Sequence, residues 1–168
     1  MKAARHIAMG CLLATCLAAC TSSLNWRTVQ LGQLSTLLPC KPDSATRPVR
    51  LGGISANMEM SGCEAGGVLF AISRIQAGDV SQAPTLMASL RQASLAQVQA
   101  GAVHPVANSG NEQTSFDLMV DGKRPDGAAM QARLKWLAAG ADVYQLAAYG
   151  ARLGTEQTEP LLSEARIQ

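Results

Sequence analysis

The chain has 168 residues, of which 48% are hydrophobic and 15% charged, and its formal net charge is +2. Because Lys2 and Arg5 supply this surplus, residues 20–168 are formally neutral, with 12 basic and 12 acidic side chains. This balance gives no electrostatic case for nucleic-acid binding, where a basic stripe would be expected, and none for a patch that binds anionic lipid. The length fits one domain with its own core.

The N-terminal segment has the parts of a secretory signal. Lys2 and Arg5 provide a basic start, residues 7–19 are almost entirely apolar, and small side chains precede Cys20. A membrane span needs about 20 apolar residues, so this run is too short to be one. We therefore expect residues 1–19 to be a cleaved signal peptide.

The signal closes on the sequence Leu17-Ala18-Ala19-Cys20, which resembles the lipobox of bacterial lipoproteins. The resemblance implies that Cys20 carries a diacylglyceryl group and, after cleavage, a further acyl chain, and two or more chains give stable anchoring. A secretory signal with a chance cysteine is the alternative. Thr21 follows where aspartate would favour the inner membrane in enterobacteria, so we expect anchoring in the outer membrane, facing the periplasm.

After the anchor, residues 20–25 are predicted as a short tether and residues 26–168 as a single domain. Residues 24–31 are expected to start the fold as a strand. Alternating apolar and polar residues predict a half-buried strand over residues 49–62, and a second strand over residues 68–75 completes a hairpin. The glycine pairs at 52–53 and 66–67 lack the context of a phosphate-binding loop and are predicted as turns.

Cys40 and Cys63 are the cysteines that remain besides the anchor. In an oxidising envelope an isolated pair is typical of a structural disulfide, which is our prediction. Redox or metal use is the alternative. Redox pairs, however, usually follow a Cys-x-x-Cys spacing, and a zinc site needs more His or free Cys than this chain has.

The long helical stretch of the sequence covers residues 82–100. Its apolar side chains share one arc at about 100° per residue, which predicts an amphipathic helix lying on a sheet. Ser81 is expected to cap it, Pro84 is tolerated in the first turn, and Gly101 is a natural stop.

The second half of the chain is predicted to be mostly strand. Turn residues separate the apolar runs, and a short helix is expected over residues 158–163 with Pro160 in its first turn. The predicted strands cover residues 103–108, 113–120, 128–138 and 143–148.

This order predicts an α+β domain with an antiparallel sheet, one long helix packed on a face and a short C-terminal helix. The layout resembles the PsbP-like fold in Leu38-Pro39 before the hairpin, in the strand at 143–146, and in residues 161–167, which are similar to its closing helix. Ala165 stands where an aromatic is common in that family. The resemblance implies a non-catalytic role in binding or assembly.

Candidate chemical residues are few. His104 lacks a neighbouring nucleophile motif and is predicted to be an ordinary surface histidine. Residues 121–127 could grip a phosphate or carboxylate, but a solvated turn is the prediction. Glu59 and Glu64 lack the aromatic platforms of a glycosidase cleft. We therefore expect no catalytic residues, no metal and no cofactor.

The expected function is a lipid-anchored, non-enzymatic envelope protein that binds or helps to assemble another envelope component. Its predicted partners are the membrane, through Cys20, and another envelope protein, with no nucleic acid. The alternative is a periplasm-facing enzyme or small-ligand-binding protein with a site built from loops, with His104 or residues 121–127 at its rim.

Overall fold

The computed structural model of the chain describes residues 24–106 and 115–168. The predicted signal and anchor at Cys20 lie outside the described residues, as does the end of the strand predicted over 103–108. No helix in the described ranges is long and apolar enough to cross a membrane.

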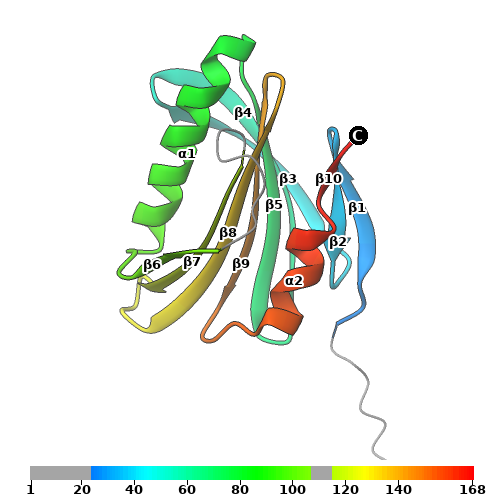
Figure 1. Cartoon of the computed structure of the whole chain (residues 1–168), viewed down its shortest axis with the longest axis vertical. Helices are drawn as coiled ribbons and strands as arrows, with labels where there is room; N and C mark the ends of the chain where they lie inside the picture. The colour runs from blue at the N-terminus through cyan, green and yellow to red at the C-terminus, as the bar shows by residue number, and fades with distance from the viewer. Residues whose placement is uncertain (1–23, 107–114) are drawn as a thin grey trace, which may run out of the picture.

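A seven-stranded antiparallel sheet forms the centre of the domain, in the order β3-β4-β5-β9-β8-β7-β6 (Figure 1). The α+β class with an antiparallel sheet is confirmed, and so is the hairpin predicted over residues 54–75. The strands are β3 (Asp43–Leu51), β4 (Ile54–Ala65), β5 (Val68–Gln76), β6 (Val103–Pro105), β7 (Ser115–Lys123), β8 (Ala129–Ala139) and β9 (Asp142–Gly150).

The single strand predicted over residues 49–62 is wrong, because Gly52 and Gly53 form a turn between β3 and β4. Gly52 has a φ of 58°, and a Cβ added there would lie 2.5 Å from Oγ of Ser89 on the neighbouring helix. Glycine meets both demands, since it tolerates positive φ and allows the close approach. The sequence contained little indication of β3 as a separate strand, because β3 is an exposed edge strand without alternating apolar residues.

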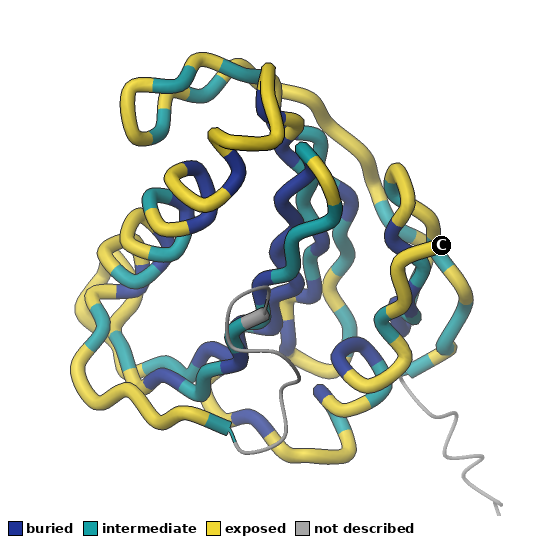
Figure 2. The backbone as a smooth tube through the Cα atoms, turned by 45° about the horizontal axis from the view of Figure 1, so that its top comes forward, coloured by how far each residue is buried: buried dark blue, intermediate teal, exposed yellow. Residues whose placement is uncertain are grey.

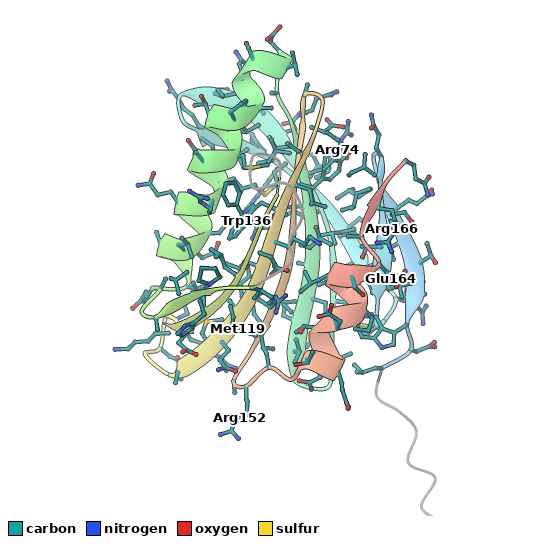
Figure 3. The ribbon with its side chains drawn as sticks, in the orientation of Figure 1. Arg74, Met119, Trp136, Arg152, Glu164 and Arg166 are labelled. Atoms are coloured by element: carbon teal, nitrogen blue, oxygen red, sulfur yellow. A yellow bond between two sulfur atoms is a disulfide. The ribbon has the colours of Figure 1, made fainter. Side chains whose placement is uncertain are left out.

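Helix α1 (Ala83–Gln97) lies on one face of this sheet, as predicted. Trp136 points from β8 toward it and is fully buried (Figure 3). The helix has no side-chain cap, so the cap predicted at Ser81 is wrong; Asp79 instead accepts from Ser81 N in the preceding turn of 3-10 helix, Val80–Gln82. The buried residues of α1 are Ala83, Leu86, Met87, Leu90 and Ser94.

The helix also ends before the predicted Gly101, because its last turn meets β7. The N–H of Lys123 donates to the Val98 carbonyl over 2.8 Å. A Cβ on Gly122 would lie 2.2 Å from that carbonyl oxygen, so the approach of β7 requires a residue without a side chain.

The opposite face carries a second layer, which the sequence did not predict (Figure 2). It contains a three-stranded sheet and helix α2 (Thr155–Ser163), which contacts β2 and β9. Pro160 lies inside α2, not in its first turn, and Arg166 belongs to a strand, not to a closing helix. The small sheet is formed by β1 (Arg27–Leu31), β2 (Leu34–Leu38) and β10 (Arg166–Ile167), in the order β1-β2-β10.

A disulfide and a polar cluster join this layer to the central sheet. Cys40, after β2, is bonded to Cys63 on β4, which confirms the predicted pair. The Tyr144 hydroxyl on β9 accepts from Gln33 N over 3.0 Å, at the β1–β2 turn, and donates to Asp142 over 3.1 Å. Both sides of the central sheet are therefore packed, each around its own core.

Candidate functional site

The face of the central sheet under α1 is only half covered. On β5, the side chains of Val68, Phe70 and Ile72 point to the opposite layer and are at most 2% exposed. Leu69 lies between them on the α1 face and is 46% exposed. The helix contacts β8, β9 and the β3 end of the sheet, so β4 and β5 keep open apolar surface beside it.

This uncovered surface forms the floor of a hollow of about 360 Å³, which we call the inner hollow. One wall is α1 and the other is the β3–β4 hairpin. Most of its lining is aliphatic or thioether surface. The principal apolar side chains are Val49, Met58, Met60, Leu69, Ala71 and Leu90.

A second hollow of about 360 Å³, which we call the mouth, adjoins the first. Both are lined by Leu69, Gln97 and Tyr149, so the two hollows lie next to each other along α1, and we call them together the α1 groove. The mouth adds Lys123 and Arg124 from the β7–β8 turn. Its volume and that of the inner hollow are in the range of small-molecule sites, which are concave and mostly apolar with a few placed polar groups.

A short polar chain crosses the groove beneath α1. The Ser94 hydroxyl lies 2.8 Å from Oε1 of Gln145 and 2.8 Å from the Leu90 carbonyl oxygen, and its one proton serves one of these acceptors at a time. Nε2 of Gln145 donates to the Tyr149 hydroxyl over 3.4 Å. Within the described part of the chain, the proton of the Tyr149 hydroxyl has no acceptor.

Burial raises the pKa of Tyr149 to about 12, while the hydrogen bond from Gln145 acts in the other direction. The phenol therefore stays protonated at any physiological pH. It is a hydrogen-bond donor on a residue that lines both hollows, and it can meet an acceptor on a bound molecule.

The cations around the groove lack acidic partners. Within residues 24–106 and 115–168, Arg47, Lys123 and Arg124 have no carboxylate within ion-pair distance; Arg47 instead contacts the Met58 sulfur over 3.8 Å. Glu64 is the acidic residue of the lining. The groove therefore carries a local positive surplus in a domain that is neutral overall.

The sequence-predicted candidates are scattered. His104 lies on the edge strand β6, 3.7 Å from Asp121, with both side chains more than half exposed and neither in the groove. Glu59 pairs with Arg74 on the opposite face of the sheet, whereas Glu64 lines the mouth. The two carboxylates therefore lie on opposite faces of the sheet.

Residues 121–127 contribute to the groove through Lys123, Arg124 and Pro125. The central groove residues Gln145 and Tyr149 were missed by the sequence reading. The sequence did contain a pattern that could have pointed to Gln145, because this polar residue stands within a mostly apolar strand. In the structure Gln145 is buried.

A buried ion pair lies outside the groove. Arg133 donates to both carboxylate oxygens of Asp117 over 2.7 and 2.8 Å, on the face opposite α1. Both groups are satisfied, which indicates a structural role. In the described ranges, no group of His, Cys, Asp and Glu side chains is placed to hold a metal ion.

No family model and no curated protein matches this sequence. Among solved structures, it is similar to the extracellular domain of PknH from Mycobacterium tuberculosis, with 10% identity, a TM-score of 0.42, and coverage of 72% of this chain and 80% of that one. It is also similar to PA94 of Pseudomonas aeruginosa, a protein of unknown function, with 17% identity, a TM-score of 0.37, and coverage of 80% and 89%. At these scores neither likeness carries an argument about function.

Proposed function

We propose that this protein is a non-catalytic binding protein of the cell envelope, which holds an elongated, mostly apolar small molecule in the α1 groove. The observation that carries the proposal is the contrast on β5, where Leu69 is 46% exposed beside Val68, Phe70 and Ile72 at 2% or less. Complete burial of a leucine is worth about 1.5–3 kcal/mol, so covering the exposed half of Leu69 with a bound apolar molecule would add roughly half of that.

The role is non-catalytic in this proposal because of the residues that line the groove. Tyr149 stays protonated, and the inner hollow, as far as the structure describes its lining, offers the hydroxyls of Ser73 and Ser94 but no His, Asp or Glu to act as a base. Acyl or phosphoryl transfer needs a nucleophile with a base within hydrogen-bond reach. The groove offers donors and apolar surface, which suit binding.

The cellular setting of the proposal rests on the sequence. Cys20 would carry the lipid that holds the domain at the outer membrane, facing the periplasm, as the lipobox resemblance implies. The domain itself would be PsbP-like, in keeping with a hairpin followed by a long helix on an antiparallel sheet. Binding of a small molecule is favoured over assembly with an envelope protein because the groove is a concave site beside the helix.

The proposal is tested with an uncharged apolar fluorophore and the full-length chain carrying Cys20→Ser, which removes the acylated thiol. The fluorophore is expected to bind with saturable, blue-shifted emission. Ala93→Trp places an indole in the inner hollow and is expected to weaken binding by about tenfold or more. Ala96→Trp, on an exposed part of α1 outside the lining, is the matched control. Equal binding by both variants would place the ligand elsewhere and overturn the proposal.

A further inference from the structure

The two ends of the groove differ in chemistry. The inner hollow is walled by Met58, Met60 and Leu90, side chains that suit a flexible alkyl chain because thioethers adapt to irregular shapes. The mouth carries two cations on adjacent residues, Lys123 and Arg124, which have no acidic partner among the residues that the structure describes. A molecule that fills both must be apolar along its length and negative at one end.

Tyr149 lies where these two halves meet, because it lines both hollows. Its hydroxyl lies 3.4 Å from Nε2 of Gln145, and its proton, which has no acceptor among the described residues, can donate to an acceptor group of a molecule whose chain runs on into the inner hollow. Glu64, at the same mouth, disfavours a second negative charge near the head. The lining therefore fits a compact anionic head on a single chain.

The mouth opens at the end of the domain to which the predicted anchor leads. The Trp26 ring packs edge-on against Phe70, with centroids 5.8 Å apart. Phe70 lies two residues from Val68, whose partner Gly150 lines the mouth. The chain from Cys20 to Trp26 can span at most about 21 Å. Figure 1 shows the start of β1, the β4–β5 turn and the β7–β8 turn at the same end.

We infer that the ligand is a single-chain anionic amphiphile of the membrane that holds the anchor. Its alkyl chain lies in the inner hollow, and its head meets Tyr149, Lys123 and Arg124. This inference rests on the proposed function, since it names the ligand class of the same groove. The approach from the membrane side follows from the shared end of the mouth and the tether.

The test compares amphiphiles with the same alkyl chain and different heads. Laurate, dodecyl phosphate, lauryl alcohol and laurylamine are titrated calorimetrically, below their micelle concentrations, into the full-length chain carrying Cys20→Ser. We expect both anions to bind about tenfold tighter than the alcohol and the amine to bind weakest. The tighter of the two anions identifies a carboxylate or a phosphate head.

Paired variants locate the head group. Lys123→Gln with Arg124→Gln should reduce the preference for laurate over lauryl alcohol to about twofold and leave binding of the alcohol unchanged. The matched control is Lys41→Gln with Arg152→Gln, which removes two exposed cations outside the groove; Arg152 projects from the lower end of the domain in Figure 3. This control should keep the full preference.

The outcomes separate the two proposals. If none of the four amphiphiles binds, the proposed function fails together with the inference. If all bind with equal affinity, the groove takes apolar molecules and the inference about charge fails alone. If the control pair lowers laurate affinity as much as the Lys123 and Arg124 pair, the head does not sit at the mouth, and the inference is overturned.

Discussion

The side-chain amide of Gln145 donates to the hydroxyl of Tyr149 four residues along the same strand, over 3.4 Å. The contact follows the α1 face of β9 and turns the phenol hydroxyl toward Gln145, which lines the inner hollow. The hydroxyl of Tyr144, on the opposite face, accepts a hydrogen bond from Gln33 N and donates one to Asp142. Two tyrosines of one strand thus have different roles, one open to a ligand and one internal.

Tyr149→Phe is expected to weaken laurate binding by about three- to tenfold, the effect of one lost hydrogen bond. The variant should lose about 1 kcal/mol of stability or less, because only the long hydrogen bond that Gln145 donates over 3.4 Å is removed. The measurements are calorimetric titration and urea unfolding. Tyr144→Phe is the control and should behave in the opposite way, losing about 1–3 kcal/mol of stability through its unpaired partners and keeping laurate affinity. The reverse pattern would contradict the assignment.

The two tyrosines should ionise late in the native protein. Burial raises the pKa of Tyr149 to about 12 and also raises the pKa of Tyr144, against an ordinary value of about 10. Near pH 10.5 Tyr149 should contribute almost no phenolate absorbance in the native protein, while more than half of the tyrosine should be ionised in denaturant. A native titration centred near pH 10 would contradict this result.

The same shift predicts a stability change. The native state keeps the Tyr149 proton to about pH 12, whereas the unfolded state releases it near pH 10, so the unfolded state binds fewer protons in between. The contribution of Tyr149 is therefore complete below pH 10 and is lost as the pH rises to about 12. Urea unfolding across this window should show the decline, and Tyr149→Phe should reduce it.

The Cys40–Cys63 disulfide should be inert to thiol reagents in the native protein and reactive after reduction in denaturant. Its cysteines are 23 residues apart in sequence. The chain-entropy relation gives about 3 kcal/mol of stability for closing such a loop. Cys40→Ala with Cys63→Ala should lose about this amount in urea unfolding. Ready labelling of the untreated protein would contradict the bond.

Anchoring depends on Cys20, in our proposal. Cys20→Ala is expected to move the protein from the membrane fraction to the soluble periplasmic fraction and to abolish incorporation of labelled palmitate. Globomycin, which blocks lipoprotein signal cleavage, should cause the uncleaved form of the wild-type chain to accumulate. Membrane fractionation that is the same for both proteins would count against the lipobox.

Elements with strong local patterns were predictable. The alternation in β4 and the helical arc of α1 reflect burial of one face, which repeats every two residues in a strand and every 3.6 in a helix. The Cys40–Cys63 pair was predictable from the cysteine count and the expected compartment. Strand β10 was not, because its two residues are strand only through pairing with Ser35 and Leu34, far away in sequence.

Local patterns in the sequence thus established the α+β class, the main helix and the disulfide, because each depends on near neighbours or on residue type. The groove depends on distant contacts. The floor of the groove is open because α1 covers only part of one face of the sheet. Gln145 and Tyr149 reach the groove because β9 pairs with β5 and β8 in one register. Composition shows that residues 20–168 are formally neutral. Folding nevertheless brings Arg47, Lys123 and Arg124 to one groove, because charges distant in sequence share a surface only after the strands pair.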